Sequence, residues 1–201
     1  MTWSNALKWV VRYSDDKHPD LENLRVHIAG VTSEDLWTKS GNSILHLAAI
    51  GESSLILEFL LQFFSSMVTM VNECEETPLH WAARQGTPRA MRILVAAGAD
   101  INAKDGWHNT PLHFAVENGK VENVQYLLSV KANKKTINAD GLTPAALAVH
   151  HEEFQIVQCL EEEESDTKKQ EQPTKSKGPL SKVKRLVRTF TISRKTSSPL
   201  I

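Results

Sequence analysis

The sequence predicts an all-α protein built from stacked helix-turn-helix units. The main observation is a 33-residue unit that is written twice between residues 72 and 137. The two copies start their first helix with Thr-Pro-Leu-His, at Thr77 and at Thr110, and both continue into apolar residues with helical spacing. Self-similarity at this period indicates repeats that bury their apolar faces against one another.

Composition limits the classes of protein that the chain can belong to. Its 201 residues are 41% apolar, enough for one folded domain with a tail. No stretch approaches the roughly 18 apolar residues of a membrane span, and the first residues lack the features of a secretory signal. We therefore expect a monomer that is neither secreted by a signal peptide nor transmembrane. Its expected compartment is the cytoplasm, with the nucleus as a second one.

Residues 1–37 are expected to form an N-terminal helical cap. Residues 5–13 carry apolar side chains on most sides of a helix, and Asp20 can cap a second helix that ends near Gly30. This helix pair lacks the Thr-Pro-Leu-His motif. Terminal units of a stack are expected to be atypical, because one of their faces meets water.

Residues 38–71 are expected to form the first recognisable repeat. It keeps Leu-His at His46 but has no proline before it. His46 and His80 are 34 residues apart, whereas His80 and His113 are 33 apart. One residue is therefore inserted in this repeat, and we expect it in the loop 65–70.

Residues 72–104 and 105–137 form the second and third expected repeats. In both, a threonine caps the first helix and a proline follows in the first helical turn, where its missing N–H costs nothing. Gly98 is expected to end the last helix of repeat two in a left-handed conformation, and Lys131 occupies the equivalent position in repeat three. We expect Lys131 to weaken that helix end modestly.

Residues 138–164 form the fourth expected repeat, which is also the C-terminal cap. It has Thr-Pro at Thr143 but alanines where Leu-His would stand, and it ends in four consecutive glutamates, 161–164. A polar outer end keeps a stack of repeats soluble.

The Thr-Pro-Leu-His motifs at this spacing, with Gly98-Ala99-Asp100 closing the first copy, resemble the ankyrin repeat family. The resemblance covers residues 38–163 well and residues 5–37 loosely. It implies an all-α ankyrin-repeat solenoid with β-turn or hairpin loops, which is not an enzyme, needs no cofactor and binds a protein partner on its concave surface. We therefore expect an interaction adaptor or scaffold.

Three recurring histidines, His46, His80 and His113, are the first candidates for a metal site. Stacked repeats separate equivalent positions by about 10 Å, too far for three nitrogens to share one ion. The resemblance implies instead that these rings make buried hydrogen bonds between adjacent turns. Cys74 and Cys159 match no metal spacing either, so no metal site is expected.

The same resemblance places the variable, partner-binding surface at the turn tips and on the exposed side of each first helix. Trp107 stands out, because tryptophan is enriched among binding hot spots; packing over a neighbouring turn is the alternative. Glu75 and His108 occupy positions where the family usually has glycine, so their turns are expected to be strained or differently shaped. The expected partner-binding residues are Glu73, Cys74, Glu76, Arg84, Gln85, Trp107, Asn109, Glu117, Asn118, Asp140 and Leu142. The same surface includes Lys39, Ser40, Asn42, Gly106, Ala139, His150 and His151.

Residues 165–201 are expected to be a disordered tail with a basic amphipathic segment at 182–195. Residues 172–201 contain eight basic and no acidic residues, so the rest of the chain carries a net charge of −9 within a total of −1. Apolar residues at i, i+3, i+4 and i+7 mark one face of a helix; these are Val183, Leu186, Val187 and Phe190.

Several uses of this tail are open. It resembles a nuclear-import signal or a membrane-binding patch at Lys182, Lys184, Arg185 and Arg188, and an amphipathic helix of this kind also enters calmodulin-like grooves. Thr191 and Ser197 resemble phosphorylation sites. The competing function is therefore a membrane- or calmodulin-targeted signalling regulator. Nucleic acid is a poor candidate partner, because the body is acidic and aromatic residues do not alternate with the basic ones.

Overall fold

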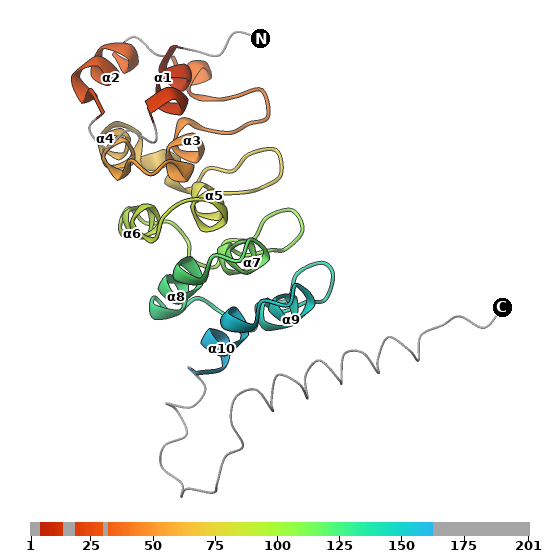
Figure 1. Ribbon diagram of the computed structural model, residues 1–201. Helices are drawn as coiled ribbons and strands as arrows, with labels where there is room; N and C mark the ends of the chain where they lie inside the picture. Colours follow the sequence, from red (N-terminus) through yellow and green to blue (C-terminus); the bar gives the residue numbers. More distant parts are fainter. Residues whose placement is uncertain (1–4, 14–18, 30–31, 163–201) are drawn as a thin grey trace, which may run out of the picture.

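The computed structural model describes residues 5–13, 19–29 and 32–162. Its helices stack in two parallel layers, with the loops projecting beyond the inner layer (Figure 1). The inner layer contains α1 (Asn5–Tyr13), α3 (Ile44–Ile50), α5 (Pro78–Arg84), α7 (Pro111–Glu117) and α9 (Pro144–His150). The outer layer contains α2 (Leu21–Ile28), α4 (Ser54–Phe64), α6 (Pro88–Ala96), α8 (Val121–Ser129) and α10 (Phe154–Glu162). The all-α stack expected from the sequence is confirmed.

The helix starts follow the caps written in the sequence. Thr77 and Thr110 each precede a proline and form a reciprocal capping box with the histidine three residues later. Asp20 caps α2 by accepting a hydrogen bond from the backbone N–H of Asn23 at 3.0 Å. Lys131 has a φ of 65°, so it takes the left-handed conformation expected from its equivalence to Gly98. Local sequence thus fixes where these helices begin and end.

The core runs between the two layers and through the inner layer. Ala82, Ala83 and Ala115 are fully buried, and their small side chains let neighbouring inner helices approach. The approach is closest at Gly86, where an added Cβ would lie 2.4 Å from the carbonyl oxygen of Ala49. This position therefore requires glycine for space rather than for an unusual backbone angle.

The first repeat differs from the others after its outer helix. α4 has 11 residues, whereas α6 and α8 have nine each. A 3₁₀ segment, η2 (Ser65–Thr69), follows it, in the region where the sequence predicts the inserted residue. Among the described helices, none has both the length and the apolarity that crossing a membrane requires.

Candidate functional site

One side chain at the start of each turn organises the turn backbone. Asn72 accepts hydrogen bonds at Oδ1 from the backbone N–H groups of Cys74 and Glu76, both at 2.9 Å. Asp105 and Asn138 repeat this arrangement at intervals of 33 residues. The sequence analysis missed these three residues, although their spacing already marked them as equivalent.

The third residue after each organising side chain has a left-handed backbone. Glu75 and His108 both have a φ of 61°, and Gly141 takes a φ of 74° at the equivalent position. The turns therefore keep one shape whichever residue stands there, and the expectation of a differently shaped turn is wrong. A side chain in this conformation costs about 1–2 kcal/mol. Of the two expectations for these turns, the left-handed φ values therefore agree with backbone strain.

Backbone hydrogen bonds join the tips of neighbouring turns. In each bond, a tip N–H donates to the carbonyl oxygen of the preceding tip. The pairs are Glu73 to Ser40 (3.4 Å), Gly106 to Cys74 (3.0 Å) and Ala139 to Trp107 (2.8 Å). The exposed tip side chains are thereby held in a fixed register along the stack.

The buried histidines connect the inner helices to these turns. His80 accepts the backbone N–H of Thr77 at Nδ1 (3.0 Å), so its Nε2 carries the proton and donates to the carbonyl oxygen of Asn109 (3.1 Å). His46 and His113 make the same pair of bonds one repeat before and after. The hydrogen-bonding role predicted for all three rings is confirmed.

Burial favours the neutral form of these rings. It lowers the pKa of His46 to about 4, and it also lowers the pKa of His80 and of His113. The described residues contain no group of three or more His, Cys, Asp or Glu side chains arranged to hold a metal ion.

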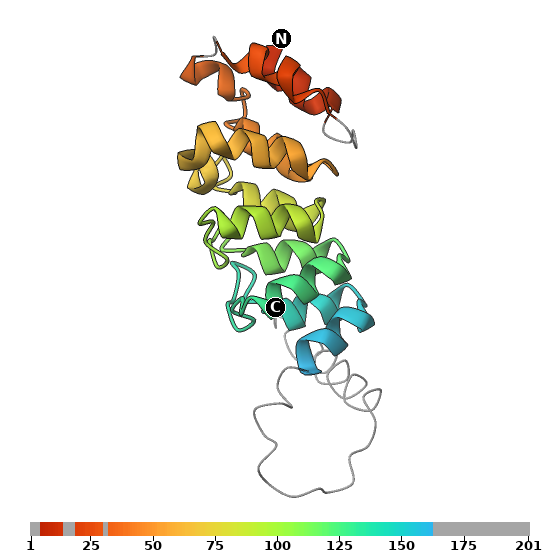
Figure 2. The same cartoon turned by 90° about the vertical axis from the view of Figure 1, so that its left-hand side faces the viewer.

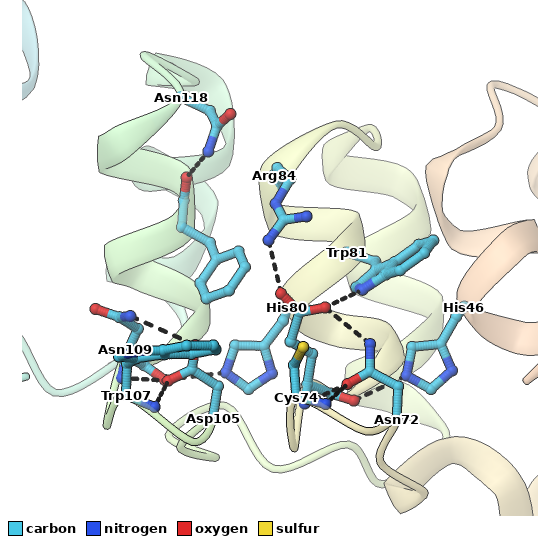
Figure 3. Close-up of polar contacts among 12 residues, drawn as sticks. His46, Asn72, Cys74, His80, Trp81, Arg84, Asp105, Trp107, Asn109 and Asn118 are labelled. Atoms are coloured by element: carbon cyan, nitrogen blue, oxygen red, sulfur yellow. Dashed lines mark hydrogen bonds and ion pairs between the residues drawn. The ribbon is translucent and has the colours of Figure 1, made fainter. Parts of the chain in front are cut away.

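Glu76 is an internal residue of the stack, which corrects the expectation that it faces a partner. It is buried, and its carboxylate accepts hydrogen bonds from Asn72 Nδ2 (2.9 Å), Trp81 Nε1 (2.6 Å) and Arg84 Nη2 (2.6 Å) (Figure 3). Burial acts to raise the pKa of Glu76, but these hydrogen bonds and the positive charge of Arg84 outweigh burial and lower it. Every donor around this carboxylate comes from its own repeat.

Arg84 links the second repeat to the third. Its guanidinium carbon lies 4.6 Å from the ring centroid of Phe114, a buried residue of the next inner helix. About a third of its side chain, 34%, stays exposed. Arg84 can therefore contact a partner while the ion pair and the cation–π contact hold its position.

Most of the other expected partner-binding residues are exposed and form two rows together with Arg84. Trp107 is 59% exposed, so the neighbouring turn covers less than half of it. Asn109 and Leu142 are half-buried, and the side chain of Asn109 accepts a hydrogen bond from Asn138 at 2.9 Å. The tip row consists of Glu73, Cys74, Trp107 and Asp140, and the helix-end row consists of Arg84, Gln85, Glu117 and Asn118.

The tail residues singled out in the sequence lie outside the described residues. These are Lys182, Lys184, Arg185, Arg188, Thr191 and Ser197. The candidate site is therefore the surface formed by the tip row and the helix-end row, with the Glu76 hydrogen-bond network beside it.

Models of ankyrin repeats match two overlapping parts of the chain. One, for three copies of the repeat, matches residues 7–105, and another, for many copies, matches residues 94–148. Together the two matches span both exposed rows.

The curated relatives match only part of this chain. Palmitoyltransferase Hip14 of Drosophila melanogaster is 40% identical over 63 residues, which are 31% of this chain and 10% of the relative. The nuclear factor NF-kappa-B p105 subunit of Gallus gallus is 30% identical over 102 residues, 43% of this chain and 10% of the relative. Palmitoyltransferase akr1 of Emericella nidulans is 35% identical over 91 residues, 42% of this chain and 12% of the relative. The chain thus spans about a tenth of the length of these proteins.

Proposed function

The chain belongs to the ankyrin repeat family, and we propose that it is a non-enzymatic adaptor that holds a protein partner against its tip row and helix-end row. Ankyrin repeats support a role in protein–protein interaction. A stack of repeats presents residues from several units on one extended surface. That surface suits a protein partner better than a small molecule, which needs a concave pocket.

The exposure of Trp107 on a fixed backbone is the observation that carries the proposal. Its own N–H is bonded to Asp105 (3.0 Å), and its carbonyl oxygen accepts the N–H of Ala139 (2.8 Å). An indole that is 59% exposed on such a backbone loses little conformational entropy when a partner covers it. Preorganised aromatic residues of this kind are frequent binding hot spots.

The charges around Trp107 indicate the chemistry of the partner. Exposed carboxylates lie along the turns at Glu73, Glu75 and Asp140. The partner surface that fits them has an apolar pocket for the indole with basic residues around it. Such charges contribute more to the association rate and to partner choice than to affinity.

The partial relatives limit how much of their function this proposal takes over. The matched region is about a tenth of each relative, and the names of two of them state a palmitoyltransferase activity. We propose only the binding role of the shared repeats for this chain. The membrane or calmodulin targeting expected of the tail depends on sequence alone and gains no support from the described residues.

Affinity capture with the full chain tests the proposal. Cell lysate is passed over the unchanged chain, a Trp107→Ala variant and a Phe154→Ala variant, and the bound proteins are quantified by mass spectrometry. Phe154 is the matched control, because its side chain is 55% exposed but lies on the outer helix α10. We expect a partner whose recovery falls at least tenfold with Trp107→Ala and is unchanged with Phe154→Ala.

The proposal is wrong if every protein retained by the unchanged chain is retained equally by the Trp107→Ala variant. A thermal melt of each variant accompanies the capture. Equal melting temperatures ensure that lost capture reports a lost contact rather than unfolding.

A further inference from the structure

The outer helix α4 carries an apolar stripe on its surface. Leu55 is 39% exposed, Phe63 is 51% exposed and Phe59 is half-buried between them. The rings of Phe59 and Phe63 lie 5.2 Å apart, centroid to centroid. These residues are spaced by four, so they follow one another along one side of the helix. We call them the α4 stripe; the side of α4 that faces the core is made of other residues, Ile56, Leu57 and Leu60.

The repeat fold does not require an apolar side chain at Leu55, the first residue of this stripe. Leu55 stands two residues after the N-cap of α4, and Arg89 and Glu122 stand at the same position in α6 and α8. α6 and α8 therefore place charge at the position of Leu55. At the other two positions they also have apolar residues, Ile93 and Tyr126 for Phe59 and Ala97 and Val130 for Phe63. Each Å² of apolar surface left in water forgoes about 25 cal/mol of stabilisation from burial. Contiguous apolar patches commonly mark interaction sites.

The two ends of the stripe stay exposed beside the neighbouring helices, whereas Phe59 packs partly against the core. Glu58 on α4 pairs with Arg89 on α6 at 3.4 Å, so the flank that carries Phe59 and Phe63 points away from α6. The main contacts of α4 are with α3, α6 and η2, whereas α2, its neighbour on that side, makes its main contacts with α1 (Figure 2). Leu55 and Phe63, the two ends of the stripe, thus stay exposed beside α2.

We propose that the basic amphipathic segment 182–195 of the same chain docks on the α4 stripe. Four apolar residues of this segment have the spacing of one helical face, Val183, Leu186, Val187 and Phe190. An apolar helix face against an apolar surface is a common way in which proteins recognise helical segments. The segment thus presents the complementary kind of surface to the one that α4 leaves open.

Charge favours the same pairing. Residues 172–201 carry eight positive charges, and the rest of the chain carries a net charge of −9, because the total is −1. Glu58, which borders the stripe, is still 45% exposed despite its pairing with Arg89. Opposite charges on the tail and the body raise the frequency of encounters between them and favour a correctly oriented contact.

The connecting segment is long enough for the contact. It comprises the 19 residues 163–181, and a flexible chain of this length has a root-mean-square span of about 25 Å. Three repeats at about 10 Å each separate α10 from α4, a similar distance. A tether that matches its span gives the segment an effective concentration of about 1 mM at α4. A weak intrinsic affinity is therefore sufficient for docking.

Docking would make the tail a regulated element. While segment 182–195 lies on α4, its basic residues are less available to other partners. A phosphate on Thr191 would reduce the positive charge of the segment and weaken its attraction to the acidic body. This regulation involves α4 and is separate from partner binding at the tip row.

Site-specific photo-crosslinking in the full chain tests the proposal. Leu186 is replaced by the photoreactive p-benzoylphenylalanine, and the crosslinked peptides are identified by mass spectrometry. We expect crosslinks within one chain to the α4 region, residues 54–64. The double variant Leu55→Ser/Phe63→Ser should lower their yield at least fivefold, whereas Phe154→Ser on α10 should leave the yield unchanged.

Other results overturn the proposal. Crosslinks that join two chains would place the segment on a second copy, and crosslinks to the tip row or to no site would remove α4 as its docking surface. An equal yield in the double variant would show that the stripe is not recognised. If a thermal melt shows that the double variant unfolds, Leu55→Ala/Phe63→Ala replaces it with the same expectation. Trp107→Ala serves as a second control, because it should disturb partner capture without changing this crosslink.

Discussion

Two successive turns of this protein share one backbone but use it differently. In residues 72–77 the side chain of Glu76 is buried and accepts three hydrogen bonds, and the exposed tip is Cys74. In residues 105–110 the equivalent of Glu76 is Asn109, which is half-buried, and the exposed tip is Trp107. The first turn buries one carboxylate, Glu76, that holds its repeat together, and the second presents an aromatic side chain to the outside.

This difference shows how a repeat protein can separate stability from recognition. Both turns make the same hydrogen bonds. A backbone N–H donates to the organising Asn or Asp, and a backbone carbonyl oxygen accepts from a buried histidine. Since that frame fixes the backbone, the side chains at the remaining positions are free to vary. Stability should therefore be sensitive to changes at Glu76, and partner binding to changes at Trp107.

The largest effect is expected from Glu76→Ala. It removes the acceptor for Asn72 and Trp81 and leaves Arg84 without its ion pair, so the free energy of unfolding should fall by about 3 kcal/mol. Asn109→Ala, at the equivalent position, should cost about 1 kcal/mol. Urea denaturation of both variants measures the difference. Equal losses would mean that the two turns do not differ in cohesion.

Acidification should weaken both turns through their histidines. An unfolded histidine binds a proton near pH 6.5, whereas folded His46 resists protonation until about pH 4. Between these values the unfolded chain binds more protons, so stability falls as the pH is lowered. From pH 7 to pH 5, His46 alone should cost about 2 kcal/mol.

Urea midpoints at several pH values check this expectation. His46→Gln removes one of the three buried titrating rings and should reduce the pH dependence, because His80 and His113 remain. His150→Gln, at an exposed position, should leave it unchanged. A pH dependence that survives in His46→Gln at full size would assign it to other groups.

A smaller gain is expected from glycine at the left-handed positions. Glu75→Gly and His108→Gly each relieve about 1–2 kcal/mol of backbone strain. Part of this gain in stability is lost, because glycine has more conformational freedom in the unfolded chain. Each should therefore raise the free energy of unfolding by about 0.5–1 kcal/mol. Thermal melts of both variants test whether the two turns share one backbone, because unequal gains would show that they do not.

The smallest effect on stability is expected from Trp107→Ala. Its side chain is 59% exposed, and substitutions at exposed positions usually change stability by less than about 0.5 kcal/mol. A loss above about 1 kcal/mol in a urea titration would mean that the indole packs on its neighbours. Trp107 would then be a packing residue, and the contrast between the two turns would disappear.

The repeat motif predicted most of the fold, because it is local. Thr-Pro-Leu-His specifies a cap, a helix start and a buried hydrogen-bonding ring within four residues, and each of these is confirmed at Thr77 and Thr110. The left-handed positions follow the same spacing, because Glu75 and His108 stand in line with Gly141. Periodic spacing made these inferences possible without knowledge of any contact between repeats.

The part of the site that the sequence did not predict depends on contacts across the turns. Glu76 and Glu73 have the same side-chain chemistry and stand three residues apart, yet one is buried with three donors and the other is exposed. Their difference arises when Trp81 and Arg84 turn back toward the start of α5 and Arg84 stacks on Phe114 of α7. The residues next to Glu76 in the sequence do not indicate where the ring of Phe114, in the next repeat, lies.

From its sequence this chain can be identified as a stack of helical repeats with variable turn tips, because caps, breakers and apolar spacing act over a few residues. The packing of the helices was needed to show which polar residues are consumed inside the stack, which remain on its surface, and that α4 exposes an apolar stripe. Burial depends on which repeats lie side by side, and a side chain's own neighbours along the chain do not contain that information.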